Sequence, residues 1–164
     1  MFKVAIITVS DKGFRGQRKD ESGPAIEQLL LGQDGYIVDE KDIVPDEVDL
    51  IKEKLLLFSD GLECDIILTS GGTGLAPRDV TPEATRGILD REIIGMSEAM
   101  RSVSMAITPT AMLSRAVCGV RGKSLIINLP GSPKGAVECL QVLLPVLPHA
   151  CELVQGKSGD CGRH

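Results

Sequence analysis

Three segments of the sequence combine glycine with proline, serine or threonine, and each comes directly after an apolar run. They are Ser10-Asp11-Lys12-Gly13, Ser70-Gly71-Gly72-Thr73-Gly74 and Pro130-Gly131-Ser132. Glycine lets the backbone approach an anion closely, and the N–H groups of such loops can cradle phosphate oxygens. One loop of this kind is more often an ordinary tight turn than a ligand site, but three of them together predict a phosphorylated ligand.

Asp79 lies directly beyond the second of these segments, in Pro77-Arg78-Asp79-Val80-Thr81. A carboxylate beside bound phosphates would repel them unless a divalent cation lay between the two. The position of Asp79 therefore predicts that it binds magnesium. The alternative is a solvated turn residue ahead of a helix that Thr81 caps.

Asp46 is the second acidic candidate, because it follows a predicted strand directly. A side chain at that point can lie along the carboxyl edge of a sheet and reach substrate or metal. Pro45-Asp46-Glu47 before an apolar helical stripe is also ordinary helix capping. The spacing favours neither interpretation, so both remain open.

Arg101 and Arg115 are candidate phosphate clamps, because a guanidinium group matches phosphate oxygens in pairs. Ser114 adjoins Arg115 after the break at Thr108-Pro109-Thr110, so both are expected in a loop or at a helix start. Solvated surface arginines are the alternative.

Two familiar nucleotide motifs are absent. The GKS triplet at 122–124 is not part of a P-loop, because that motif requires a glycine at position 117, where this sequence has Val117. Gly72-Thr73-Gly74 lacks the third glycine of the dinucleotide fingerprint, since Pro77 takes its place. The pattern therefore disfavours a P-loop NTPase and a nicotinamide site.

Strands and helices alternate along the chain. Apolar runs predict strands at 4–9, 64–69 and 123–128, a further strand is predicted at 36–44, and helical spacing predicts helices that start near 23, 46, 81, 97 and 133. Pro24 is expected at the first position of the earliest helix. This order predicts an α/β fold, a three-layer α/β/α sandwich around a mostly parallel sheet, with ligands at the carboxyl ends of the strands.

Length and composition limit the remaining possibilities. The 164 residues, 43% of them hydrophobic, predict a single domain over 1–156 and a flexible tail over 157–164. The net charge of −5 and only four scattered aromatic residues argue against nucleic-acid binding. Five cysteines without a CxxC pair and two histidines argue against a zinc site. We find no stretch that predicts a membrane span or signal peptide, and we expect a cytoplasmic protein.

Four segments together resemble the molybdopterin adenylyltransferase family, which includes bacterial Mog proteins and the G domains of plant and animal molybdenum-insertion proteins. The resemblance spans Val4 to about Gly156. The segments are 69–74, Pro77-Arg78-Asp79-Val80-Thr81-Pro82-Glu83-Ala84-Thr85, Leu113-Ser114-Arg115 and Asn128-Leu129-Pro130-Gly131-Ser132-Pro133.

The resemblance implies an enzyme that joins AMP from ATP to the terminal phosphate of molybdopterin and releases pyrophosphate. Asp79 and Asp46 match the family's functional aspartates, with Asp79 holding Mg²⁺ against the ATP phosphates. The glycine loop and Pro130-Gly131-Ser132 would line the nucleotide and phosphate pocket. A homotrimer is implied, and a molybdenum-insertion protein is a candidate partner.

Two other functions are compatible with the same fold. One is a pterin-binding or scaffold paralogue without adenylylation, against which the intact Asp46, Asp79 and glycine loop argue. The other is the related domain of nicotinamide-nucleotide salvage proteins, whose loop usually differs where this chain has Arg78-Asp79-Val80-Thr81.

Overall fold

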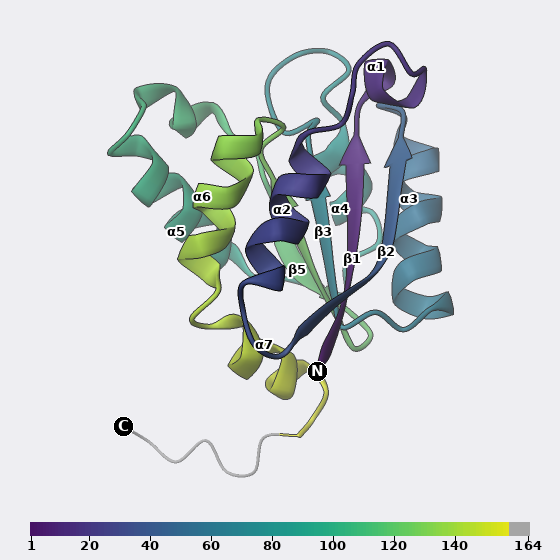
Figure 1. Cartoon of the computed structure of the whole chain (residues 1–164), viewed down its shortest axis with the longest axis vertical. Helices are drawn as coiled ribbons and strands as arrows, with labels where there is room; N and C mark the ends of the chain where they lie inside the picture. The colour runs from purple at the N-terminus through teal and green to yellow at the C-terminus, as the bar shows by residue number, and fades with distance from the viewer. Residues whose placement is uncertain (158–164) are drawn as a thin grey trace.

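The computed structural model describes residues 1–157, which fold around one six-stranded sheet (Figure 1). The strand order is β2-β1-β3-β6-β5-β4. The strands are β1 (Phe2–Val9), β2 (Tyr36–Val44), β3 (Ile66–Ser70), β4 (Arg91–Glu92), β5 (Cys118–Arg121) and β6 (Ser124–Leu129). The neighbours β2, β1, β3 and β6 are parallel, whereas β5 is antiparallel to both β6 and β4. The carboxyl ends of the parallel strands therefore meet at one edge.

Helices cover both faces of the sheet, as Figure 1 shows. One buried cluster joins Ile6, Leu68 and Ile127 to α2, α5, α6 and α7; the other joins Ile7 and Ile67 to α3 and α4. The helices are α1 (Asp11–Phe14), α2 (Ser22–Leu31), α3 (Val48–Leu56), α4 (Thr81–Arg86), α5 (Ile94–Met105), α6 (Pro133–Leu143) and α7 (Leu147–Val154), with single turns η1 (Leu57–Gly61) and η2 (Pro109–Leu113). Central strands that are apolar on both faces require such cover.

The predicted α/β/α sandwich is confirmed, and the strand predicted at 36–44 matches β2. Two strands were missed. β4 has only two residues and β5 only four, so neither presents a run that a pattern can detect. The GKS triplet lies at the β5–β6 hairpin, where Arg121 pairs with Ser124 and Gly122 has a φ of 53°. Pro24 is the third residue of α2, because Asp20 allows the helix to begin at Ser22.

Buried polar groups join α4 to the sheet. Asn128 is fully buried in β6, and its Nδ2 donates to the hydroxyls of Thr69 and Thr85, each over 2.9 Å. Its Oδ1 accepts the Val117 N–H over 3.1 Å. Buried polar groups are costly unless they are paired, so these bonds specify where α4 lies relative to β3.

Within residues 1–157, no single helix is long and apolar enough to cross a membrane. Only α6 and α7 taken together reach that length and composition, and a bend of 68° separates them. The described cysteines Cys64, Cys118, Cys139 and Cys151 are all free and buried. The predicted tail, apart from Lys157, lies outside the described residues.

Candidate active site

The strand-end loops line a polar pocket of about 460 Å³ at the carboxyl edge of the sheet. Loops after β1, β2, β3 and β6 all contribute to it, so segments far apart in the sequence converge there as predicted. The predicted site residues that line it are Ser10, Asp46, Ser70, Gly71, Gly72, Asp79, Gly131 and Ser132. Its size is in the range of small-molecule sites.

The loops after β3 and β6 are joined to each other. The Ser70 hydroxyl donates to the Pro130 carbonyl over 2.8 Å, and the Gly71 N–H donates to the Leu129 carbonyl over 3.1 Å. A Cβ at Gly131 would lie 3.3 Å from the Gly71 Cα, which shows how closely the two backbones approach. The two loops therefore form one rigid wall of the pocket.

Gly71 and Gly72 have φ values of 105° and 66°, a region that side-chain-bearing residues rarely adopt. A Cβ at Gly71 would overlap the Val9 carbonyl oxygen of the neighbouring strand, and one at Gly72 would overlap the Thr81 hydroxyl. The absence of side chains at both positions is thus a steric requirement. The N–H of Gly72 donates no hydrogen bond within residues 1–157.

Thr81 stabilises the glycine loop through two hydrogen bonds to its backbone carbonyl groups. Its hydroxyl donates to the Gly71 carbonyl over 2.9 Å, and its N–H donates to the Gly72 carbonyl over 3.1 Å. The expected capping role of Thr81 is wrong, because Val80 is the N-cap of α4 and Thr81 is its first helical residue. The hydroxyl stabilises the loop instead.

Asp46 does not cap α3 through its side chain. Glu47 occupies the N-cap of that helix, and no side-chain capping bond forms there. The Oδ2 atom of Asp46 instead accepts the Asp11 N–H over 2.8 Å, and the Asp46 N–H donates to Asp11 Oδ1 over 3.1 Å. The capping interpretation is therefore excluded, and the carboxylate lies on the pocket wall.

Asp79 is held by its own loop. Its Oδ2 atom accepts the Ala76 N–H over 2.9 Å, while its Oδ1 atom accepts no hydrogen bond from the described part of the chain. The same is true of Oδ1 of Asp46. Each carboxylate thus retains one oxygen that is free to bind a ligand in the pocket.

These free oxygens fit a magnesium ion. Mg²⁺ prefers oxygen ligands and is usually held by one or two carboxylates together with substrate phosphates and water. Among residues 1–157, no three His, Cys, Asp or Glu side chains are grouped to hold a metal by themselves. Asp79 and Asp46 would supply protein oxygens, and a bound phosphate would supply others.

The carboxylates of this edge differ in their electrostatic environment. Burial raises the pKa of Asp46, and the negative charges of Asp11 and Asp79 raise it further, although the Asp11 N–H opposes the shift. The hydrogen bonds from Arg78 lower the pKa of Asp11. A cation bound between Asp46 and Asp79 would therefore reduce the electrostatic repulsion between these carboxylates in the folded protein.

The remaining predicted residues are divided between structural contacts and a second pocket. The Ser10 hydroxyl accepts the Gly13 N–H and caps α1, and the Ser132 hydroxyl accepts the Gly135 N–H and caps α6, each over 3.1 Å. Asp11 is not on the wall of the polar pocket, since both of its carboxylate oxygens face Arg78.

A second pocket of about 280 Å³ lies beside the first, between α5, η2 and α6. The predicted residues Thr73, Gly74, Ser114 and Pro130 line this one, and Ser132 lines both. Met100, Ile107 and Leu113 give it apolar walls. The predicted set therefore spans a polar compartment and an adjoining apolar one.

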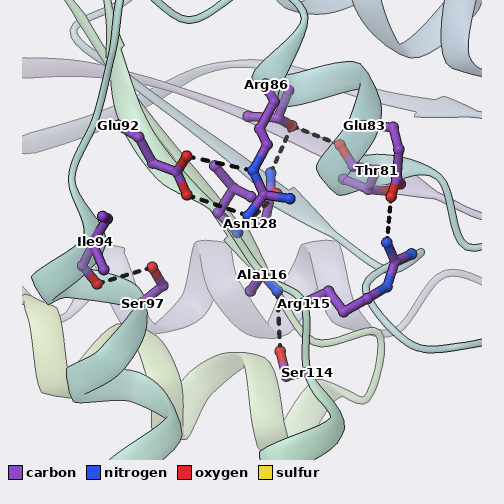
Figure 2. A network of polar contacts seen from close by, with 12 residues as sticks. Thr81, Glu83, Arg86, Glu92, Ile94, Ser97, Ser114, Arg115, Ala116 and Asn128 are labelled. Carbon is purple, nitrogen blue, oxygen red and sulfur yellow. Dashed lines mark hydrogen bonds and ion pairs between the residues drawn. The ribbon is translucent and has the colours of Figure 1, made fainter.

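Arg115 is bound to the protein itself (Figure 2). Its Nε donates to the Gly74 carbonyl over 2.8 Å, one terminal nitrogen donates to the Asp79 carbonyl over 2.6 Å, and the other pairs with Glu83. Arg101 donates to the Ser114 and Ala116 carbonyls. Both guanidinium groups position the loops around the pockets, and a role of either as a phosphate clamp stays a prediction.

Residues 5–149 match the family described as "Probable molybdopterin binding domain". The chain belongs to this molybdopterin-binding family. The matched range begins within β1 and ends within α7, so it contains every residue that lines the two pockets.

Similar proteins agree with this family assignment. The chain is 41% identical over 157 residues to a molybdopterin adenylyltransferase of Helicobacter pylori, covering 93% of this chain and 88% of that protein. It is 40% identical over 140 residues to the molybdopterin adenylyltransferase of Escherichia coli, covering 85% of this chain and 72% of that protein. The crystal structure of the molybdopterin biosynthesis enzyme MoaB from Thermus thermophilus is 57% identical, with a TM-score of 0.91 and coverage of 98% and 100%.

Residues 18–22 also line the polar pocket of this molybdopterin-binding domain, and the sequence analysis singled out none of them; Arg18, Lys19 and Asp20 are among them. Asp20 accepts the N–H groups of Ser22 and Gly23 at the start of α2. An Asp shortly before the Ser-Gly-Pro helix start was the available signal for this contact. The two cations lie in a loop with no pattern to distinguish them from a solvated surface.

Proposed function

We propose that this chain adenylylates molybdopterin: it transfers AMP from ATP to the terminal phosphate of the pterin and releases pyrophosphate. One observation carries the proposal. Gly72, Gly131 and Ser132 line the polar pocket together with Asp46 and Asp79, and the N–H groups of these three residues donate no hydrogen bond to any described residue. Unpaired amides beside two carboxylates suit phosphates whose charge a cation shares.

The polar pocket is assigned to the phosphates. Its wall includes Ser132 and Pro133 at the start of α6, where the positive end of the helix dipole favours an anion. The apolar pocket next to it suits a flat ring of one of the two substrates, because Met100 and Leu113 offer apolar surface there. Ser132 lies where the two compartments meet.

The transfer itself is an in-line displacement at phosphorus. An oxygen of the pterin phosphate forms a bond to the α-phosphorus of ATP, and the bond from that phosphorus to the β-phosphate oxygen breaks, so pyrophosphate leaves with the electron pair. Magnesium, when bound, neutralises charge on the phosphates. The unpaired amides of Gly72 and Gly131 orient the phosphate oxygens, and Asp46 and Asp79 position the cation.

The same proposal includes a homotrimer and a cytoplasmic location. A homotrimer is supported by exposed apolar side chains of α5, η2 and the turn between them, namely Val103, Met105, Ile107, Met112 and Leu113. Light scattering that gives the mass of a monomer would count against it. A cytoplasmic location suits the free, buried state of the four cysteines within residues 1–157, and transfer of the product to a molybdenum-insertion protein remains a prediction.

The test of the reaction is incubation of the protein with molybdopterin, ATP and Mg²⁺. Adenylylated pterin and pyrophosphate should appear in equal amounts, and chelation of Mg²⁺ should stop both. A protein that binds the pterin but forms neither product would be the non-catalytic paralogue. Replacing ATP by a nicotinamide mononucleotide tests the salvage-type activity, for which we expect no turnover.

Arg18→Ala combined with Lys19→Ala should weaken ATP binding. Both side chains line the polar pocket, and neither forms an ion pair within residues 1–157, so their charge is available to phosphates. We expect the KM for ATP to rise about tenfold with kcat nearly unchanged, and the rise to shrink at high salt. Lys41→Ala, which only removes a surface pair with Glu27, is the control. Equal KM values in all three proteins would remove the two cations from the site.

A further inference from the structure

Arg78 lies at the meeting point of three strand-end loops. Its Nε and one terminal nitrogen donate to the two carboxylate oxygens of Asp11, over 2.6 and 2.9 Å. The same guanidinium group lies 3.9 Å from Glu47. Arg78 itself directly precedes Asp79. One side chain thus connects the loop after β3 with the loops after β1 and β2.

Asp11 connects this arginine to Asp46. Each of the two aspartates donates its N–H to the carboxylate of the other, over 2.8 and 3.1 Å. Oδ1 of Asp11 accepts hydrogen bonds from both the Asp46 N–H and a terminal N–H of Arg78. The orientation of Asp46 therefore depends on where Arg78 holds Asp11. A chain of contacts therefore runs from the Asp79 loop through Arg78 and Asp11 to the Asp46 carboxylate.

We propose that Arg78 and Asp11 are positioning residues that set the distance between Asp46 and Asp79 without contacting the substrates. This inference rests on the proposed function for its kinetic test. Its geometry favours the indirect role, because both oxygens of Asp11 are engaged by Arg78 and Asp11 is absent from the wall of the polar pocket. Asp11, which the sequence analysis placed in one of the predicted phosphate-binding segments, would then act through Asp46.

The experiment compares Arg78→Ala with Arg86→Ala. Arg86 is a matched control, because it also donates to both oxygens of one carboxylate, that of Glu92, and its side chain is 51% exposed against 56% for Arg78. For Arg78→Ala we expect kcat to fall about 10- to 100-fold while the KM for ATP changes little, since misplaced catalytic groups mainly affect turnover. Arg86→Ala should retain the parent kcat.

Chemical rescue separates positioning from general damage to the fold. Arg78 is exposed enough for guanidinium ion to enter the space that its removal opens, so millimolar guanidinium should restore part of the turnover of Arg78→Ala. Asp11→Asn keeps an oxygen for the Asp46 N–H but cannot accept both Arg78 bonds. It should lose turnover without any rescue, because its arginine is still present.

Amide exchange measured by NMR tests the contacts without any substrate. The N–H groups of Asp11 and Asp46 should exchange faster in Arg78→Ala than in the parent and in Arg86→Ala. If the parent protein makes no adenylylated pterin, the proposed function fails, and the exchange rates still decide whether Arg78 holds the aspartate pair. Unchanged exchange in Arg78→Ala, or a raised KM with an unchanged kcat, would overturn the inference.

Discussion

Asp79→Asn should reduce kcat by about 10²- to 10³-fold while the fold and the affinity for molybdopterin persist. The amide oxygen of asparagine can still accept the Ala76 N–H, so the loop keeps its hydrogen bond over 2.9 Å. What disappears is the negative charge on the free oxygen that faces the pocket. Pyrophosphate release measured over a range of Mg²⁺ concentrations gives kcat and the apparent metal affinity.

The control for this substitution is Asp34→Asn, which removes the same charge from an exposed position between α2 and β2. Its kcat should equal that of the parent. An Asp79→Asn variant with the turnover and Mg²⁺ dependence of the parent would remove Asp79 from the mechanism. A variant that loses pterin binding as well would indicate that Asp79 shapes the pocket instead of serving the cation.

Gly71→Ala should destabilise the protein by about 3 kcal/mol and abolish turnover, because the new Cβ adds a collision to an unfavourable φ. The φ at this position is 105°, and the collision is with the Val9 carbonyl in the adjacent strand β1, which cannot yield without moving the strand. The glycine loop would have to shift away from Val9. Urea unfolding gives the change in the free energy of unfolding, and the adenylylation assay gives the turnover.

Gly35→Ala is the matched control, since Gly35 has a φ of 94° but no atom within 4 Å of the position that a Cβ would take. It should cost about 1 kcal/mol, from the backbone conformation alone, and leave kcat unchanged. The difference between the two variants measures the collision at Gly71. Similar stability losses in both would mean that the strand accommodates the methyl group, and the close approach would then have no steric role.

Local patterns in the sequence were sufficient for the fold class and for much of the site. Apolar runs predicted β1, β3 and β6, because strands covered on both faces need continuous apolar residues. The strand predicted at 36–44 forms β2, an edge strand in which half-buried and exposed residues alternate. Parallel strands bring their carboxyl ends to one edge, so the glycine segments at 70–74 and 130–132 were expected to converge. The structure brings them into contact there through Ser70 and Pro130.

Contacts between distant residues could not be predicted in this way. The Asp46–Asp11 pair joins residues 35 apart, and the Arg78–Asp11 pair joins residues 67 apart, so no local spacing encodes either of them. The capping pattern around Asp46 was equally compatible with a different role, because a Pro-Asp-Glu sequence has the same form whether or not its carboxylate turns toward a neighbouring loop.

The sequence by itself thus determined that the protein is a layered α/β domain with glycine-containing loops after its strands and an acidic residue beside them, because those features depend on residue type and short-range spacing. Only the tertiary structure decided which side chains line the pocket and which hold the loops. In the folded protein, Arg115 binds the Gly74 and Asp79 carbonyls and the Glu83 carboxylate. Asp46 and Asp79 line the pocket, and each keeps one carboxylate oxygen without a hydrogen bond from residues 1–157. The physical reason is that a polar group is satisfied by whichever partner the folded chain brings near, and that partner is set by the packing of the strands.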